Sequence, residues 1–211
     1  MTPLCAALFF LKEAFDVRRL YYPNSSFASC DRALLKGANP YRVCRKFLES
    51  QGATHVHLYG ETPLTTWAKI AQEAEICPED FFVDLGCGRG RGVFFMAHQT
   101  GCRAHGIDSI LEFVEKGNAI AEKFPRVTFS CEDLFFAQLH SATVIYLYGT
   151  CLTDEEVERL SALLGRLKKG TRIISISEPL PGNFSLKKEF SVTFPWGRTS
   201  AYLQIVASYL P

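Results

Sequence analysis

The sequence predicts a doubly wound α/β fold, in which a largely parallel sheet carries helices on both faces. Short apolar runs of strand length alternate with segments of helical periodicity from residue 59 onward. The runs are apolar throughout, as expected of parallel strands that are buried on both faces. A glycine-rich segment follows the first run, at the position where such a sheet binds its ligands.

The length and net charge of the chain favour a single-domain protein that does not bind nucleic acid or membranes. The 211 residues correspond to one domain with a small addition. The formal net charge of +1 argues against nucleic acid or anionic lipid as a partner, and no apolar stretch reaches the roughly 18 residues of a membrane span. Leu4–Leu11 has no basic residue before it, so a signal peptide is not expected.

The eight cysteines form no CxxC pair and show no zinc-ligand spacing with histidine, so no metal site is predicted. We expect them to be reduced thiols that pack as small apolar side chains. Reduced thiols are typical of proteins in the cytoplasm, so a cytoplasmic location is expected.

Five strands of the parallel sheet can be placed from their apolar runs. The first is Phe81–Leu85, and the other four are predicted at 103–107, 127–129, 143–147 and 171–177. The helix before the fifth strand begins at a capping box of Thr153 and Glu156. We expect this helix to continue through Lys168 and Lys169 until Gly170 ends it.

The C-terminal part of the chain switches to a hairpin. Two further strands, Phe190–Phe194 and Ala201–Val206, flank the turn Pro195-Trp196-Gly197. With the five earlier strands this predicts a Rossmann-like seven-stranded sheet that has an antiparallel C-terminal strand. The sheet and its helices would form a domain of residues 58–211.

Residues 1–57 are predicted to be an N-terminal helical accessory segment. The spacing of Leu8, Leu11, Phe15 and Leu20 indicates an amphipathic helix, which the segment 22–26 then breaks. A second helix is expected to begin at Asn39-Pro40 and to end near Gly52.

The strongest functional signal is the segment Val83-Asp84-Leu85-Gly86-Cys87-Gly88-Arg89-Gly90, which leaves the first strand and enters a helix. Glycine is required where a backbone turns tightly and approaches a ligand. Acids mark three successive strands, because Asp84 lies in the first, Asp108 ends the second and Asp133 follows the third. At this edge of the sheet, Asp108 is placed to hold a ribose and Asp133 to meet an adenine amine.

A dinucleotide is one candidate ligand, but its fingerprint needs glycine at position 91, where this chain has Arg91. The phosphate-binding GKS or GKT is absent as well. Glycines stand instead at alternate positions, 86, 88, 90 and 92. The form Asp-x-Gly-x-Gly-x-Gly resembles the first motif of class I, or seven-strand, S-adenosylmethionine-dependent methyltransferases.

This resemblance covers about residues 58–209 and implies S-adenosyl-L-methionine as the cofactor. It implies that the glycine motif lies beside the methionine half, that Asp108 holds the ribose hydroxyls, and that Asp133 and Leu134 adjoin the adenine. The cofactor-binding residues that it implies are Tyr59, Thr62, Asp84, Gly86, Cys87, Gly88, Gly90, Asp108, Ser109, Asp133, Leu134 and Tyr148.

A narrower resemblance rests on Tyr59-Gly60-Glu61-Thr62, one helix before the glycine motif. This segment is similar to one in the disruptor-of-telomeric-silencing family, the histone lysine methyltransferases that lack a SET domain. There it closes over the methionine part of the cofactor. Segments 82–86 and 144–147 and the late Trp196 match that family as well. From local structure alone, 59–62 is equally a turn in which Thr62 or Thr65 caps the next helix.

The resemblance implies a protein lysine as the methyl acceptor, with Tyr148 and Glu61 as candidate catalytic residues. An apolar channel would favour the neutral amine, and its candidate lining residues are Tyr59, Tyr146, Tyr148 and Trp196. The chain departs from the family at Tyr148-Gly149-Thr150, where the family has Asn-Asn-Phe.

Other acceptors stay open. The Asn-Pro-Pro-Tyr motif of base methylation is absent, so a base is a poorer candidate. A small-molecule methyltransferase of the same fold is the main alternative, with residues 1–57 as a lid over its pocket. A binding module that has lost turnover is the third hypothesis.

Overall fold

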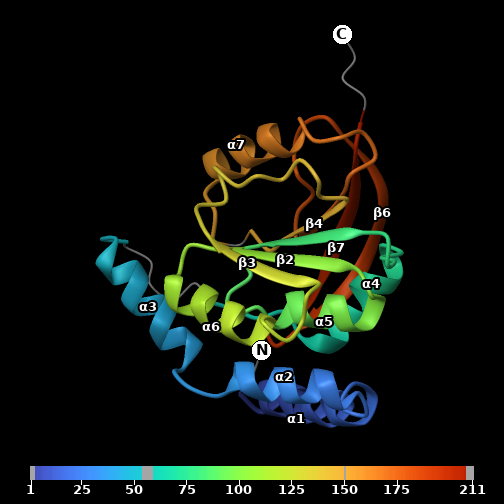
Figure 1. Ribbon diagram of the computed structural model, residues 1–211. Coiled ribbons are helices and arrows are strands. Elements are labelled where there is room, and N and C mark those ends of the chain that lie inside the picture. The colour runs from blue at the N-terminus through green and yellow to red at the C-terminus, as the bar shows by residue number, and fades with distance from the viewer. Residues whose placement is uncertain (1–2, 54–58, 150, 208–211) are drawn as a thin grey trace.

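The computed structural model describes residues 3–53, 59–149 and 151–207. Seven strands form one sheet in the order β3-β2-β1-β4-β5-β7-β6 (Figure 1). Strands β1 to β5 are parallel, whereas β7 runs antiparallel to both β5 and β6. The predicted doubly wound sheet with its antiparallel C-terminal strand is therefore confirmed. The strands are β1 Phe81–Leu85, β2 Arg103–Asp108, β3 Val127–Cys131, β4 Val144–Leu147, β5 Arg172–Ile176, β6 Phe184–Phe194 and β7 Gly197–Val206.

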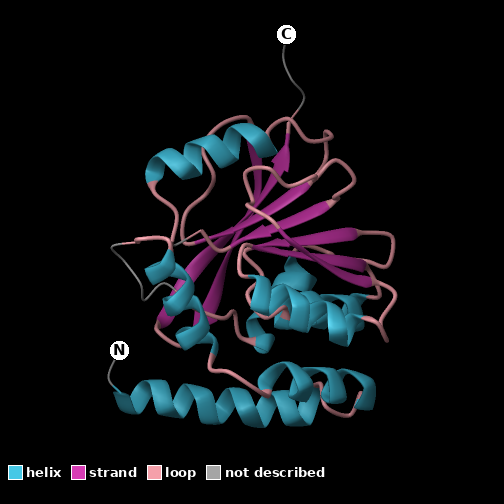
Figure 2. Ribbon diagram, turned by 60° about the vertical axis from the view of Figure 1, so that its left-hand side comes forward, coloured by secondary structure: helices cyan, strands magenta, loops and turns pink. Residues whose placement is uncertain are grey.

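Helices cover both faces of the sheet, with α4, α5 and α6 on one side and α7 on the other (Figures 1 and 2). Successive strand residues point to opposite faces, so Phe82 and Tyr146 pack toward the first layer while Val83 and Ile145 pack toward the second. This explains why the predicted strands are apolar throughout. The helices are α4 Leu64–Glu73, α5 Arg91–Thr100, α6 Leu111–Ala121 and α7 Asp154–Leu164.

The first two helices of the N-terminal segment, α1 and α2, form a further layer beneath α4 and α5, whereas α3 packs beside α6 (Figures 1 and 2). The segment consists of α1 Pro3–Leu20, α2 Ser25–Leu35 and α3 Pro40–Ser50. Val17 of α1 and Phe27 of α2 are buried in the same cluster as α4 and α5, and the Phe27 ring lies 5.6 Å from that of Phe95. The segment thus shares the core of the sheet. The boundary proposed between residues 57 and 58 lies outside the described residues.

Two expectations about the N-terminal segment are corrected. Helix α2 was not predicted, because Pro23 and the serines at 25 and 26 were interpreted as a break. Instead, Asn24 caps α2 by accepting a hydrogen bond from the amide of Phe27 (3.0 Å). Helix α1 is present, but Leu8, Leu11, Phe15 and Leu20 lie on its outer side, 58%, 69%, 65% and 50% exposed. Its buried side carries Val17 instead.

Three boundaries also differ from expectation. The capping box of Thr153 and Glu156 is present, but α7 ends at Leu164, so Lys168 and Lys169 follow the helix. Pro63 is the N-cap of α4, and neither Thr62 nor Thr65 caps it. Strand β6 begins six residues before position 190, because its first half is an edge strand whose polar residues face solvent.

No helix among the described residues is long and apolar enough to cross a membrane. No cluster of histidine, cysteine and acidic side chains in the described ranges has the arrangement of a metal site. The eight cysteines all lie in these ranges, and none of them forms a disulfide there.

Candidate active site

The glycine loop joins β1 to α5 at the carboxyl edge of the sheet. The amides of Gly86 and Cys87 donate to the carbonyl of Ile107 in β2, at 2.9 and 3.0 Å, which holds the loop against the neighbouring strand. Gly86 has a φ of +78°, and no atom lies within 4 Å of the position that a β-carbon would occupy. A ligand can therefore approach the backbone closely at this point.

Asp84 and Asp108 approach the loop from two adjacent strands. Asp84 is 4% exposed and makes no hydrogen bond or ion pair with any residue of the described ranges. Burial, together with the nearby charge of Asp108, raises the pKa of Asp84 to about 8. A buried carboxyl group without a partner at the wall of a pocket fits a cationic ligand group.

Asp108 is held in one orientation by two backbone amides. Its Oδ2 accepts from Gly88 (2.8 Å) and its Oδ1 from Ile110 (2.9 Å). Burial raises its pKa, and these two hydrogen bonds oppose the rise. Because a carboxylate has about four acceptor positions, Asp108 keeps one on each oxygen for a further donor.

The remaining acid lies farther along the same edge. Asp133 follows β3, is exposed, and accepts from the amide of Phe135 at 2.9 Å. Ser109 is exposed as well, whereas Leu134 packs partly against the layer of α7. None of these three residues lines the small pocket beside the glycine loop.

The segment 59–62 lies across the glycine loop. Gly88 has a φ of +54°, which favours glycine, and a β-carbon there would lie 3.0 Å from the Tyr59 hydroxyl, so the tyrosine lies directly over this residue. The same hydroxyl donates to Glu61 (2.6 Å), and the Thr62 hydroxyl hydrogen-bonds that of Tyr146 (2.6 Å). The turn of this segment thus brings Tyr59, Glu61 and Thr62 onto the loop.

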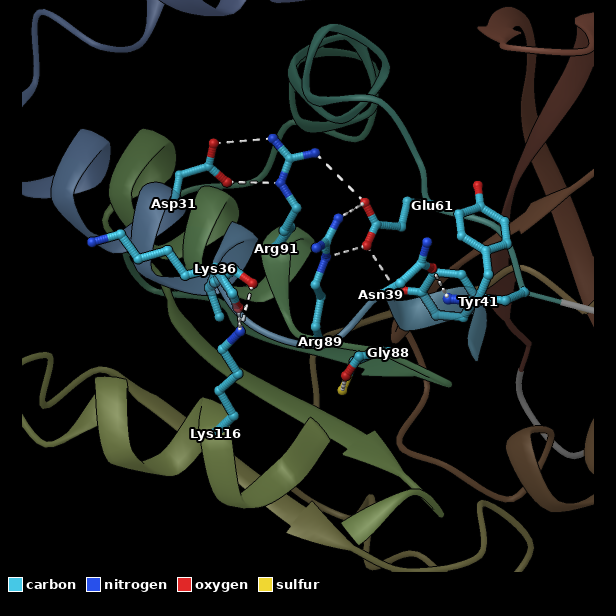
Figure 3. Close-up of polar contacts among 12 residues, drawn as sticks. Asp31, Lys36, Asn39, Tyr41, Glu61, Gly88, Arg89, Arg91 and Lys116 are labelled. Atoms are coloured by element: carbon cyan, nitrogen blue, oxygen red, sulfur yellow. Dashed lines mark hydrogen bonds and ion pairs between the residues drawn. The ribbon is translucent and has the colours of Figure 1, made fainter. Parts of the chain in front are cut away.

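A chain of ion pairs surrounds Glu61 (Figure 3). Arg89 of the loop donates to both carboxylate oxygens of Glu61, at 2.5 and 2.8 Å. Arg91, the first residue of α5, lies 3.6 Å from Glu61 and donates to both oxygens of Asp31 on α2, at 2.7 and 3.0 Å. Burial opposes ionisation of Glu61, but the hydrogen bonds and charge of Arg89 outweigh it and lower its pKa.

Sequence reasoning did not assign Asp31, Arg89 or Arg91 to the site. The sequence did contain one signal for the ion pair at Arg91. A cation in the first turn of a helix is unfavourable unless an acidic side chain lies beside it, so Arg91 required an acidic partner. The partner Asp31 is 60 residues away and could not be identified from spacing.

Two adjoining cavities open beside the loop and share Tyr59, Glu61, Thr62 and Tyr148. The inner one, of about 40 Å³, reaches Asp84, Gly86 and Cys87. The outer one, of about 550 Å³, is also lined by Glu13, Glu61 and Arg91. Most of its wall consists of aromatic side chains from distant parts of the chain, namely Phe9, Phe10, Tyr41, Tyr59, Tyr148, Phe194 and Trp196.

The structure therefore brings together three of the four aromatic residues predicted to line a channel, Tyr59, Tyr148 and Trp196. Trp196 donates through Nε1 to the Tyr148 hydroxyl (2.9 Å). The Phe194 ring packs against both, with its centroid 5.0 Å from that of Tyr148 and 5.4 Å from that of Trp196. Tyr146 is buried against Trp67 and lines the inner cavity instead. Thr150 lies outside the described residues.

A sheet of this order, with a glycine loop after β1 and an acid at the end of β2, defines a class I S-adenosylmethionine-dependent methyltransferase, whose cofactor is S-adenosyl-L-methionine. Comparison with known proteins agrees. The family described as histone methylation protein DOT1 matches residues 45–128. A histone-lysine N-methyltransferase, H3 lysine-79 specific, from Dictyostelium discoideum is 27% identical over 158 residues. That alignment covers 66% of this chain and 8% of the relative, so the chain spans a small part of that protein.

Solved structures show the same fold. An RNA methyltransferase from Salinibacter ruber in complex with S-adenosyl-L-homocysteine has a TM-score of 0.62 at 26% identity, covering 72% of this chain and 97% of that one. TrmN from Thermus thermophilus has a TM-score of 0.58 at 15% identity, covering 70% of this chain and 50% of that one. The resemblance to class I methyltransferases and to the histone lysine methyltransferases without a SET domain, inferred from the sequence, is thus confirmed.

Proposed function

We propose that this chain transfers the methyl group of S-adenosyl-L-methionine to the side-chain amine of a lysine in a protein. The observation that carries the proposal is the outer cavity of about 550 Å³, which has aromatic walls and adjoins the glycine loop. The match to the DOT1 family and the similarity to a histone-lysine methyltransferase support it.

The inner cavity and the sheet edge beside it are the proposed cofactor site. The open backbone at Gly86 suits the methionine half, and the carboxyl group of Asp84, which has no hydrogen-bond partner among the described residues, suits its ammonium group. The remaining acceptor positions of Asp108 suit the two ribose hydroxyls. Farther along the edge, Ser109, Asp133 and Leu134 would adjoin the adenine. The residues that complete the site are Tyr59, Thr62, Cys87, Gly88, Gly90 and Tyr148.

When bound, the cofactor supplies a methyl group on a sulfonium, which an amine displaces in line. The rings of Tyr148, Phe194 and Trp196 exclude water and orient the acceptor beside the loop. Their apolar surfaces disfavour a charged ammonium, so the lysine reacts as the neutral amine. The methylated amine is formed as a cation and then loses a proton to solvent. Glu61 is proposed to act through its ion pairs, which hold the loop and Tyr59 in place.

A labelled methyl-transfer assay tests this proposal. The protein is incubated with methyl-labelled cofactor and, in parallel, with core histones, lysine-rich peptides, transfer RNA and a metabolite extract. We expect label on lysine of a protein substrate, identified by mass spectrometry. Label on a metabolite alone would establish the small-molecule alternative, and no transfer to any substrate despite cofactor binding would favour a binding module.

RNA is a second candidate acceptor, and one specific observation favours it. The Salinibacter ruber protein, to which this chain is 26% identical, is an RNA methyltransferase, and 97% of it is covered. The formal net charge of +1 opposes this reading, because phosphate contacts require clustered cations. Transfer of label to transfer RNA in the same assay would establish RNA as the acceptor.

A further inference from the structure

A second groove, of about 580 Å³, lies next to the outer cavity along α1. The two hollows share Phe9 and Glu13 of α1, so they adjoin each other along this helix. The other walls of the groove come from α4 and from the hairpin of β6 and β7.

The groove is lined by three basic side chains, two of which, Lys12 and Lys69, have an acidic neighbour on their own helix, Asp16 and Glu73. Lys69 of α4 and Arg198 of β7 line it and make no hydrogen bond or ion pair with any described residue. Lys12 of α1 lines it as well and pairs with Asp16 at 2.6 Å.

The one carboxylate that lines the groove, Glu13, is already engaged. Its two oxygens accept from the amide (3.2 Å) and the hydroxyl (2.5 Å) of Thr65. The neighbouring Glu73 on α4 forms an ion pair with Lys188. The groove is thus polar, and within the described residues Lys69 and Arg198 form no close ion pair, although Glu73 lies near enough to Lys69 to feel its charge. The cavity beside it is largely aromatic.

We propose that this groove binds the segment of a protein acceptor that flanks the methylated lysine, and that this flanking segment is acidic. The inference rests on the proposed function and names the substrate class more closely. Charge complementarity supports it, because Lys69 and Arg198 would pair with one or two carboxylates of an extended peptide. An RNA strand would instead require a row of cations, whereas Glu13, Asp16 and Glu73 are interspersed here.

The N-terminal segment is then part of the substrate site. Phe9 and Glu13 of α1 connect the aromatic cavity to the basic groove, and Thr65 holds Glu13 in place. Selection between acceptors would arise at short range, because exposed charges are screened beyond about 10 Å at ordinary salt.

Peptide binding without turnover tests the inference. Two fluorescein-labelled peptides, each with one central lysine flanked by either glutamates or serines, are titrated with the full chain in the presence of S-adenosyl-L-homocysteine. We expect the glutamate peptide to bind more tightly by about fivefold to tenfold, as two partly solvated ion pairs would give. The double variant Lys69→Glu/Arg198→Glu should remove this preference. Its affinity for S-adenosyl-L-homocysteine, measured by calorimetry, should be unchanged.

The matched control is Lys168→Glu/Lys169→Glu, which makes the same change in charge at two exposed lysines between α7 and β5. Retention of the preference in the control, and its loss in the groove variant, supports the inference. Equal loss in both variants, no preference in the unaltered chain, or groove-dependent binding of a single-stranded RNA oligonucleotide instead would overturn it. If the peptide preference depends on the groove but the protein methylates no protein substrate, the groove is a peptide-binding site and the proposed lysine methylation is wrong.

Discussion

Arg91 at the start of α5 donates both of its hydrogen bonds to Asp31 of α2 at 2.7 and 3.0 Å, and the Asp31 side chain is fully buried. This pair links the N-terminal segment to the end of the glycine loop. Arg91 also lies 3.6 Å from Glu61, and Tyr22 donates to Asp31 at 2.9 Å. The N-terminal helices are therefore held to the glycine loop by charge as well as by apolar packing.

Replacing Asp31 by Asn should destabilise the protein by about 3 kcal/mol, because removing one partner of a buried ion pair leaves an uncompensated charge on Arg91. Urea denaturation followed by circular dichroism measures this free energy of unfolding. The control Asp16→Asn breaks the pair with the exposed Lys12, which is worth about 0–1 kcal/mol. An equal decrease in the free energy of unfolding for the two variants would show that the buried Asp31–Arg91 pair contributes no more to stability than the exposed pair.

Replacing Asp108 by Ala should weaken the binding of S-adenosyl-L-homocysteine by about 1.5–3 kcal/mol, because hydrogen bonds from ribose hydroxyls to a carboxylate are lost. Isothermal titration calorimetry measures the affinity. Glu158→Ala on α7 removes an exposed carboxylate far from the loop and should leave the affinity unchanged. Unchanged affinity in the Asp108 variant would refute its assignment to the ribose.

Cofactor binding should release a proton from Asp84 below pH 8. The pKa of Asp84 is raised to about 8 in the chain, so the carboxyl group is mostly protonated at pH 7. An ammonium group bound beside it would favour the carboxylate and lower that pKa, so affinity should increase as pH rises from about 6 to 8. Calorimetry in buffers of different ionisation enthalpy counts the released protons, and Asp84→Asn should abolish the release. Identical proton release by both proteins would contradict this placement.

The raised pKa of Asp84 also predicts how the stability of the ligand-free protein depends on pH. Between the ordinary pKa of an aspartate, about 3.9, and the raised value, the folded chain binds more protons than the unfolded chain. The contribution of Asp84 to the free energy of unfolding is therefore fully present at low pH and decreases as pH rises through this window. Thermal unfolding of wild type and Asp84→Asn from pH 5 to 9 should show a fall with pH that is smaller in the variant. Parallel curves would contradict it.

Replacing Tyr148 by Ala should reduce turnover by about tenfold or more and should weaken cofactor binding by less than that, because the ring walls the outer cavity as well as the inner one. Tyr148→Phe keeps the ring and should retain more activity than the alanine variant. The turnover of all three proteins should rise with pH where the acceptor amine loses its proton. A parallel loss of cofactor affinity and turnover in Tyr148→Ala would place this residue in the cofactor site alone.

The sequence by itself determined the sheet and the alternation of its strands and helices along the chain from residue 59 onward. Strands such as Phe81–Leu85 and Val144–Leu147 are apolar on both faces, and the glycines after β1 are demanded by local backbone geometry, so both signals lie within a few adjacent residues. The acids at 84 and 108 follow from the same strands, because the ends of parallel strands meet at one edge.

Only the tertiary structure decided which distant residues complete the site. Asp31 meets Arg91 across 60 residues, and Phe9 of α1 joins Trp196 of the hairpin around one cavity. The apolar spacing of α1 predicted a helix, but Leu8, Leu11 and Phe15 lie on its exposed side, because the packing of α4 and α5 against Val17 sets which side is buried. Periodicity reports local conformation, whereas the choice of partner depends on contacts between elements that are far apart in the chain.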